Sequence, residues 1–327
     1  MFGKFASLIV LIGISFSAFT YFAMKECENF TIPNQNGKVF IVTGGNSGLG
    51  YETVKSFAHA GGIVILASRS LSKGNEAKEN ILKENPRGKI VVAELDLASF
   101  ASIRKFAENI KEKFDHIDVL INNAGVMALP NRETTKDGLE MQIGTNHFGH
   151  FLLTSLIYPL LSQNGRVINH SSGAYIFGSK NFPDGDIQSL TSYSPWGAYG
   201  NSKLSNLLFT YELNRRLESV NNPKNIVSIA VHPGYSATNL QQGKFPLWET
   251  MNQLFAMKAE YGAQAQILAA VGQGVGEKPV YGTMIGPKYA AIGAPAIEKI
   301  KSAAVNENSE RKLWEISNEI TGANFLS

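Results

Sequence analysis

Short apolar runs alternate with longer amphipathic segments along the chain from Gly37 onward. The runs are rich in Val and Ile and apolar on both faces, a pattern typical of parallel strands that helices cover on both sides. This rhythm predicts an α/β fold with a doubly wound parallel sheet, whose ligands bind at the carboxyl ends of the strands. The predicted strands are Val39–Thr43, Ile63–Ala67, Lys89–Leu95, Ile117–Asn122, Arg166–His170, Ile226–Val231 and a last one at Val280–Ile285; the predicted helices are Leu49–His59, Ser72–Asn85, Ser99–Phe114, Thr134–Leu161 and Pro195–Ser219.

The end of the chain predicts one more helix, which begins at about Ser309 and ends before Gly322, a residue suited to a C-terminal cap. We expect it to pack back on the same domain through an apolar stripe, so that residues 37–327 form one Rossmann-fold domain. Before it, apolar and aromatic positions favour a helical lid over a hydrophobic ligand, or equally an ordinary packed helix. The stripe is Leu313, Ile316 and Ile320, and the lid positions are Phe245, Leu247, Trp248, Met251, Leu254, Phe255 and Met257.

The N-terminal segment is a separate unit, predicted over residues 1–30. Phe5–Met24 carry no charged side chain, and about 20 helical residues span about 30 Å, the thickness of a bilayer core. We interpret the segment as a membrane anchor, at the endoplasmic reticulum if the protein is eukaryotic. A signal peptide cleaved near Ser17 and a buried core helix are the alternatives. Its orientation is open because basic residues are balanced across the run.

Composition narrows the classes of function. The chain has 327 residues, of which 44% are hydrophobic and 17% charged, which suits a globular core rather than disorder. Its 30 basic and 27 acidic residues are too even to predict a nucleic-acid surface. With one cysteine, Cys27, it forms no internal disulfide and no cysteine zinc cluster. We therefore expect no nucleic acid and no metal.

A glycine-rich turn, Thr43–Gly50, follows the first predicted strand and opens the first helix. Glycines there let the backbone approach a pyrophosphate, and the helix N-terminus offers free N–H groups and partial positive charge. A structural turn is the alternative for such a motif alone. Its place between a strand and a helix favours a dinucleotide site.

The end of the second strand bears on the choice of dinucleotide. An NAD site usually has an acid about 20 residues beyond the glycines, whereas this chain reads Leu66-Ala67-Ser68-Arg69-Ser70. Because the planar guanidinium of Arg69 suits a 2′-phosphate, the sequence favours NADP(H) over NAD(H). An exposed arginine at a strand end is the alternative.

Tyr199 and Lys203 lie four residues apart within a predicted helix and therefore on one face. An ammonium near a phenol favours the phenolate, so we expect Lys203 to lower the tyrosine pKa from about 10. The phenol would then serve as a general acid or base.

Taken in order, the motifs resemble those of the short-chain dehydrogenase/reductase family over roughly residues 37–240. Four further features are similar to its retinol dehydrogenase-like branch. They are the segment Asn146–Phe151, the N-terminal anchor, the long stretch between Ser172 and Tyr199, and Leu313-Trp314-Glu315. The motifs are Thr-Gly-x-x-x-Gly-x-Gly at 43–50, Asn122-Asn123-Ala124-Gly125, Asn146, Ser172, Tyr199-x-x-x-Lys203 and Pro233-Gly234.

The resemblance implies catalytic roles for four residues. Tyr199 exchanges a proton with the substrate oxygen, Lys203 binds the nicotinamide ribose, Ser172 hydrogen-bonds the substrate oxygen in preference to Ser171, and Asn146 holds a water. The dinucleotide-binding positions begin with the glycine-rich turn and the arginine after the second strand: Gly44, Asn46, Ser47, Gly48, Leu49, Gly50 and Arg69. Asp96 and Leu97 are expected near the adenine, and Asn123, Ala124 and Gly125 on the adenosine side. Tyr199 and Lys203 also belong to the set, and Pro233, Gly234 and Thr238 are expected at the nicotinamide.

Each of these residues also has a purely structural explanation. Asn146 suits a buried kink in a long helix, Ser172 a cap of the following turn, Asp96 an N-cap for the helix at Ser99, and Pro233-Gly234 a turn. Their joint occurrence in family order favours the catalytic interpretation.

The sequence thus predicts an NADP-dependent oxidoreductase that acts on a lipophilic carbonyl or alcohol, such as a retinoid, a steroid or a long-chain aldehyde. A dinucleotide-binding scaffold without catalysis is one alternative. A protochlorophyllide-type reductase is another, although it relies on an active-site cysteine, whereas Cys27 lies beside the anchor. Members of the family often pair as homodimers through two long helices, and an anchored member can stay monomeric.

Overall fold

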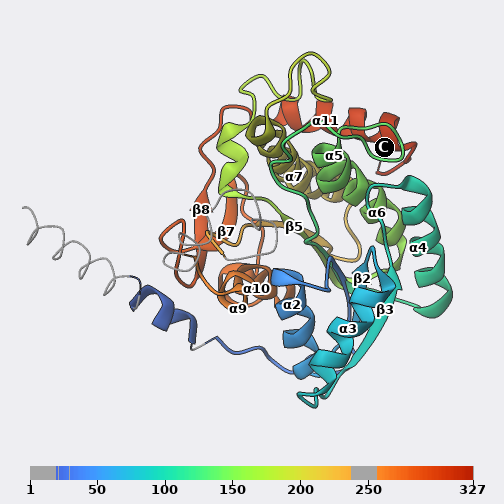
Figure 1. Cartoon of the computed structure of the whole chain (residues 1–327), viewed down its shortest axis with the longest axis vertical. Helices are drawn as coiled ribbons and strands as arrows, with labels where there is room; N and C mark the ends of the chain where they lie inside the picture. Colours follow the sequence, from blue (N-terminus) through green and yellow to red (C-terminus); the bar gives the residue numbers. More distant parts are fainter. Residues whose placement is uncertain (1–19, 21, 29, 237–255, 327) are drawn as a thin grey trace, which may run out of the picture.

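One eight-stranded sheet forms the centre of the molecule, seen here in a computed structural model that describes residues 20, 22–28, 30–236 and 256–326 (Figure 1). The strand order is β3-β2-β1-β4-β5-β6-β7-β8. All neighbouring strands are parallel except β7 and β8, which are antiparallel. The bounds are β1 Val39–Thr43, β2 Ile63–Ser68, β3 Lys89–Glu94, β4 Ile117–Asn122, β5 Leu161–His170, β6 Val227–Val231, β7 Thr283–Pro287 and β8 Pro295–Lys299.

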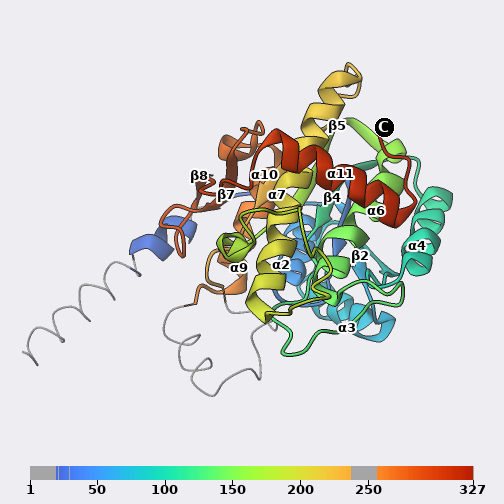
Figure 2. The same cartoon turned by 90° about the horizontal axis from the view of Figure 1, so that it is seen from above.

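Helices cover both faces of this sheet (Figures 1 and 2). Helices α4, α6 and α7 bury apolar side chains against one face, and α2, α3 and α10 against the other. This explains why the strands are apolar on both sides. The bounds are α2 Gly48–His59, α3 Leu71–Leu82, α4 Phe100–Lys113, α5 Met141–Ile143, α6 Gly149–Ile157, α7 Pro195–Ser219, α9 Ala259–Gly262, α10 Gln264–Val271 and α11 Glu307–Thr321.

The predicted doubly wound sheet is confirmed, but the helix predicted over 134–161 is wrong at both ends. Thr134 pairs with Glu140 in a β-bridge, and Glu140 caps the helix that begins at Met141. A π-helical turn, Gly144–Phe148, separates α5 from α6, and Leu161 already belongs to β5. The apolar pattern could not separate these pieces because nearly all their side chains are buried and the pattern has no polar face.

The end of the sheet also differs from the prediction. The predicted strand Val280–Ile285 begins later, at Thr283, and a further antiparallel strand, β8, follows it. Its sequence, Pro-Ala-Ile-Glu-Lys, is half exposed, so it lacks the apolar run that marks the inner strands.

The C-terminal helix α11 packs back on α7, as predicted (Figure 2). Leu313 and Trp314 are buried, and Gly322 ends the helix with φ of 63°, the left-handed conformation that favours glycine.

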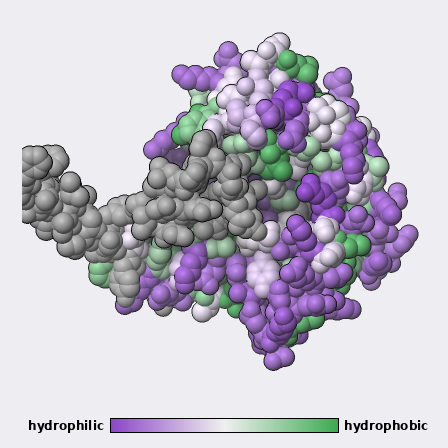
Figure 3. Space-filling view, viewed as in Figure 1, coloured by the Kyte–Doolittle hydropathy of each residue, from purple (hydrophilic) through white to green (hydrophobic). Residues whose placement is uncertain are grey.

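At the other end, residues 22–28 are helical and join the domain next to α9 and the β7–β8 turn. Ala23 packs in a cluster with Met257 and Ile292, Gln264 Nε2 donates to the carbonyl of Cys27 at 2.8 Å, and Lys288 pairs with Glu26 at 3.0 Å. Most of Phe5–Met24 lies outside the described residues, and within the described part no helix has the length and apolarity to span a bilayer. The visible surface of the domain is mainly hydrophilic (Figure 3).

Candidate active site

A cavity of about 530 Å³ lies at the carboxyl ends of the parallel strands. Most of the residues predicted from the sequence line it, which places the glycine-rich turn and the Tyr-Lys pair around one space. Asn146 is buried and does not line the cavity, and Thr238 lies outside the described residues. The predicted residues in the wall are Gly44, Asn46, Ser47, Gly48, Leu49, Gly50, Arg69, Asp96, Leu97, Asn123, Ala124, Gly125, Ser172, Tyr199, Lys203, Pro233 and Gly234.

Two glycines of the glycine-rich turn, Gly44 and Gly50, cannot be replaced by larger residues without strain or a steric clash. Gly44 has φ of +66°, and a Cβ on Gly50 would lie 2.3 Å from the Gly44 carbonyl oxygen. Ser47 is the N-cap of α2, but its side chain forms no capping bond. The first N–H groups of α2 therefore remain available at the cavity wall, together with the positive end of the helix dipole. This arrangement fits the pyrophosphate of a dinucleotide.

Thr43 joins the glycine-rich turn to the end of β4. Its hydroxyl oxygen accepts hydrogen bonds of 2.9 Å from the backbone N–H groups of both Asn123 and Ala124. The Asn123 side chain donates to the Thr43 carbonyl at 2.8 Å. Two walls of the cavity are thus held at a fixed separation by buried polar contacts.

At the end of β2, the Arg69 side chain is exposed at the cavity rim. Among the described residues, none forms an ion pair with it. Ser68 Oγ donates to Asn46 Oδ1 at 3.1 Å, which ties the arginine's strand to the glycine-rich turn. The guanidinium is therefore free to bind an anion beside that turn.

Asp96 follows β3 and lines the cavity, where Lys136 pairs with it at 2.9 Å. The alternative that Asp96 caps the helix at Ser99 is wrong, because Ser99 itself is the N-cap of α4. The Asp96 carboxylate instead accepts from the backbone N–H of Ala98 at 3.1 Å.

Tyr199 and Lys203 lie on one face of α7, as their spacing predicts, with the Lys203 Nζ 5.6 Å from the centre of the tyrosine ring. The Ser172 hydroxyl interacts with the Tyr199 phenol. It also accepts from the N–H of Ala174 at 3.2 Å, which confirms the alternative that Ser172 caps the following turn. Ser171 points elsewhere, since its hydroxyl donates to the Lys203 carbonyl at 2.8 Å.

The prediction that Lys203 lowers the Tyr199 pKa is wrong for the protein chain. Burial raises the pKa of Tyr199 to about 12, against a smaller lowering by Ser172. Burial also lowers the pKa of Lys203 to about 8. Both side chains are less than a tenth exposed, and desolvation disfavours the charged form of each. Tyr199 is therefore held protonated.

Asn146 lies in the π-helical turn and joins it to α7. Its Oδ1 accepts from the N–H of Val126 at 2.8 Å, and its Nδ2 donates to the Val126 carbonyl and to Ser202 Oγ at 2.9 Å each. Ser202 Oγ in turn donates to the Tyr199 carbonyl at 2.8 Å. Asn146 is therefore a buried residue of an irregular helical turn, as its structural alternative predicts, and Ser202 links it to the backbone of Tyr199.

Several wall residues had no motif to signal them, among them Trp196 and His170. Trp196, 39% exposed, stands at the cavity rim between Phe177 and Tyr199, with ring centres 6.1 Å from each. His170 supplies the carbonyl that Lys203 binds at 3.1 Å. Trp196 lies three residues before Tyr199, and this helical spacing was the only available signal.

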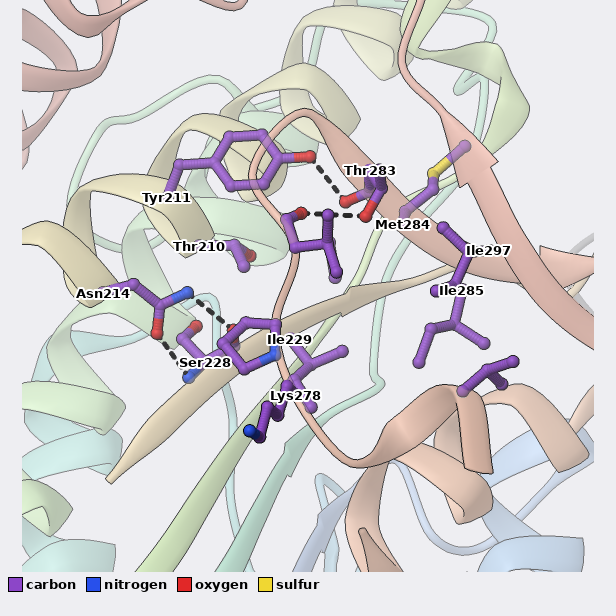
Figure 4. A pocket seen from close by; sticks show the side chains of 14 residues that line it. Thr210, Tyr211, Asn214, Ser228, Ile229, Lys278, Thr283, Met284, Ile285 and Ile297 are labelled. Carbon is purple, nitrogen blue, oxygen red and sulfur yellow. Dashed lines mark hydrogen bonds between the residues drawn. The ribbon is translucent and has the colours of Figure 1, made fainter. Parts of the chain in front are cut away.

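A second cavity, of about 10 Å³, lies between α7, β6 and β7 (Figure 4). Tyr211 donates to the Thr283 carbonyl at 2.6 Å, and the Asn214 amide bonds both backbone groups of Ser228 at 2.8 Å. The polar groups there hold the helix against the sheet, which indicates a packing seam rather than a ligand site.

Comparison with known proteins agrees with this geometry. Residues 38–184 match the family model for short chain dehydrogenases. Retinol dehydrogenase 12 of Mus musculus is 36% identical over 325 residues, which cover 98% of this chain and 96% of that protein. The chain therefore belongs to the short-chain dehydrogenase/reductase family, in its retinol dehydrogenase-like branch, and is an oxidoreductase whose fold binds a nicotinamide dinucleotide.

Solved structures show the same fold. The crystal structure of an uncharacterized protein from Mycobacterium Paratuberculosis aligns with a TM-score of 0.72 at 35% identity, and covers 91% of this chain and 98% of that one. A short chain dehydrogenase from Burkholderia cenocepacia J2315, solved in complex with NADP, aligns with a TM-score of 0.58 at 21% identity, over 72% of this chain and 91% of that one.

Proposed function

We propose that this protein transfers a hydride between NADP(H) and a lipophilic carbonyl or alcohol, with Tyr199 as the general acid/base. One observation carries the proposal: the Tyr199 phenol, the Ser172 hydroxyl and Lys203 line the same cavity as the glycine-rich turn. A proton donor and a dinucleotide cradle around one space are what carbonyl reduction needs.

The residues present fit the dinucleotide. The N–H groups of the Gly44–Gly50 turn and α2 would hold its pyrophosphate. Asp96 and Leu97, which line the same cavity, would contact the adenine, and Lys203 would bind the nicotinamide ribose. The proposed role of Pro233, Gly234 and Thr238 is contact with the nicotinamide. When bound, the nicotinamide exchanges the hydride with the substrate carbon.

The protein's own contribution is the proton. Tyr199 stays protonated because burial raises its pKa to about 12, and this is the form that donates to a carbonyl oxygen. The Ser172 hydroxyl would hydrogen-bond that oxygen, and the Lys203 ammonium would stabilise the phenolate that remains. One lone pair of Asn146 Oδ1 is left for a water that would carry the replacement proton towards Lys203.

Arg69 supports NADP(H) in particular. Its guanidinium is exposed beside the glycine-rich turn, and a carboxylate for ribose hydroxyls is missing from the Ser68-Arg69-Ser70 sequence. The NADP bound by the Burkholderia enzyme is consistent with this choice. The expected 2′-phosphate contact is a bidentate pair.

The aromatic rim supports a lipophilic substrate. Trp196 lines the cavity beside Tyr199 and is 39% exposed, and Phe177, which is 56% exposed, contacts the Trp196 ring. Exposed aromatic side chains at a cavity mouth favour an extended apolar ligand, such as a retinoid, a steroid or a long-chain aldehyde. Membrane anchoring by residues 1–30, at the endoplasmic reticulum in a eukaryote, would bring residues 37–327 to such substrates. The proposal also includes a homodimer that forms through long helices.

The test uses detergent-solubilised full-length protein, NADPH and a panel of retinoid, steroid and aliphatic aldehydes, followed by cofactor absorbance. We expect turnover by wild type, and a loss of about 10²-fold or more in Tyr199→Phe with NADPH binding retained. Equal turnover by both proteins would overturn the mechanism. NADPH binding without oxidation of NADPH by any aldehyde of the panel would instead favour a non-catalytic scaffold.

A further inference from the structure

His150 lies in α6, fully surrounded by protein and only 2% exposed, and it does not line the cavity. Its Nδ1 lies 3.0 Å from the Asn146 carbonyl oxygen, and its Nε2 lies 2.9 Å from Thr43 Oγ1. One imidazole ring therefore bridges Asn146 and Thr43, the first residue of the glycine-rich turn.

The partners determine where the imidazole proton lies. The Asn146 carbonyl can only accept, so Nδ1 carries the proton and the Nε2 of the neutral ring accepts from the Thr43 hydroxyl. The oxygen of Thr43 already accepts from the N–H groups of Asn123 and Ala124. Its proton has Nε2 at 2.9 Å and, further away, the Ile121 carbonyl at 3.3 Å.

A charged imidazolium does not fit this position. Its second N–H would face the Thr43 oxygen, whose lone pairs are in use. Burial first, and then the charge of Lys203, lower the pKa of His150 to about 4. The ring is thus neutral at physiological pH, with one tautomer selected.

The imidazole contact falls in the π-helical turn. There the N–H of Gly149 donates to the Gly144 carbonyl, five residues back, and the His150 side chain donates to the backbone carbonyl of Asn146. Beyond Asn146, the chain of donors continues through Ser202 Oγ to the Tyr199 carbonyl. In this series of hydrogen bonds, the Asn146 amide donates to the Ser202 hydroxyl, and the Ser202 hydroxyl donates to the Tyr199 carbonyl.

We propose that His150 is a positioning residue, which fixes Asn146 and through it the Tyr199 segment of α7 relative to the phosphate-binding turn. It touches neither reactant, and acts by holding the proton donor and the dinucleotide cradle in one geometry. The inference rests on the proposed reductase function for its kinetic consequence.

The first test compares His150→Phe, which keeps the ring but removes both hydrogen bonds, with His150→Asn, which keeps a donor near the Asn146 carbonyl. We expect His150→Phe to lower kcat by about tenfold or more, with KM for the aldehyde within about threefold, and His150→Asn to recover part of the loss. The matched control is Thr154→Val, which removes a buried hydroxyl from the same helix that bonds Asn122 and the His150 carbonyl. Its Tm should fall while its kcat stays near wild type.

A second measurement does not depend on turnover or on a variant that folds. NMR of ¹⁵N-histidine-labelled wild type should show His150 with its proton on Nδ1 from about pH 5 to about pH 8. A proton on Nε2, or a His150→Phe enzyme as active as Thr154→Val, would overturn the inference. A wild-type protein without turnover on any aldehyde, but with the Nδ1 proton in place, would overturn the proposed function and leave the hydrogen-bond chain standing.

Discussion

The Lys203 ammonium donates a 3.1 Å hydrogen bond to the carbonyl oxygen of His170, the last residue of β5. The Asn206 amide donates to the same oxygen at 2.9 Å. Because this carbonyl keeps a partner without the lysine, the main energetic consequence of Lys203 is the burial of its charge. Its pKa falls from 10.5 to about 8 for that reason.

Lys203→Met should therefore stabilise the protein while abolishing turnover. We expect the free energy of unfolding at pH 7 to rise by on the order of 1–2 kcal/mol, less than the full pKa shift because one hydrogen bond is lost. Urea denaturation of the two proteins measures it. A variant less stable than wild type would show that the lysine contributes more through its contacts than its charge costs.

The pH dependence gives an independent check on the same charge. Between the folded pKa of about 8 and the ordinary value of 10.5, the unfolded chain binds the lysine proton and the folded chain does not. Wild-type stability should therefore gain a rising contribution across this window, which Lys203→Met lacks. Parallel stability curves for the two proteins between these pH values would contradict the assignment.

Arg69→Glu should reverse the cofactor preference. The substitution removes the proposed partner of the 2′-phosphate and places a repulsive charge beside it, while a carboxylate suits the ribose hydroxyls of NADH. We expect the Kd for NADPH to rise by about tenfold to a hundredfold and that for NADH to change little or fall, as measured by nucleotide fluorescence.

The control is Lys83→Glu, the same change of charge at an exposed residue that ends α3. Its NADPH affinity should change only slightly, since exposed charges beyond a Debye length are screened. Equal effects at both positions would mean that net charge, rather than a contact of Arg69, sets the preference.

The sheet and much of the cavity wall were predictable because both depend on local signals. The bounds of β1, β4 and α7 match the prediction, since Val/Ile runs and a Ser-Pro helix start mark them directly. The glycine turn and the Tyr-Lys pair meet because parallel strands end at one edge of the sheet.

Features that depend on contacts between distant segments were not predictable. The π-helical turn at Asn146 is held by Val126 and Ser202, which the local pattern does not reveal. The Tyr199 pKa was predicted in the wrong direction because the spacing reports a neighbouring charge but not the burial of both groups. The role of His150 needs Thr43, which is distant in sequence but only 2.9 Å away.

Trp196→Ala should impair long apolar substrates selectively. The indole lies at the cavity rim beside Tyr199, and truncation removes aromatic surface that an apolar chain would cover, worth about 1–2 kcal/mol. We expect KM for a retinoid or long-chain aldehyde to rise by about tenfold and kcat/KM for a short aldehyde to stay within about twofold.

Leu190→Ala serves as the control, because Leu190 is 74% exposed in the connection that precedes α7 and does not line the cavity. It should leave both substrates unaffected. A Trp196→Ala enzyme that loses activity equally on short and long aldehydes would indicate that the indole orients Tyr199 rather than the substrate.

A charge cluster with two buried carboxylates joins the C-terminal helix α11 to α7. Glu310 in α11 is fully buried and binds Arg215 in α7, and Tyr281 donates to it at 2.9 Å. Arg216 pairs with Glu212 at 2.7 Å and lies 4.8 Å from the centre of the Trp314 ring.

Arg215→Met should destabilise the protein by about 2–4 kcal/mol at pH 7. Among the described residues, it leaves the buried Glu310 carboxylate with Tyr281 alone as a side-chain partner. Burial already raises the Glu310 pKa, and Arg215 opposes this. In the variant the folded state therefore binds a proton that the unfolded state releases, so the deficit should shrink as the pH is lowered. Urea denaturation at neutral pH and near pH 5 tests both points. The control is Arg311→Met, which breaks an exposed pair with Glu307 and should lower the free energy of unfolding by less than about 1 kcal/mol. A deficit that is the same at both pH values would mean that lost packing, rather than an unpaired carboxylate, causes the instability.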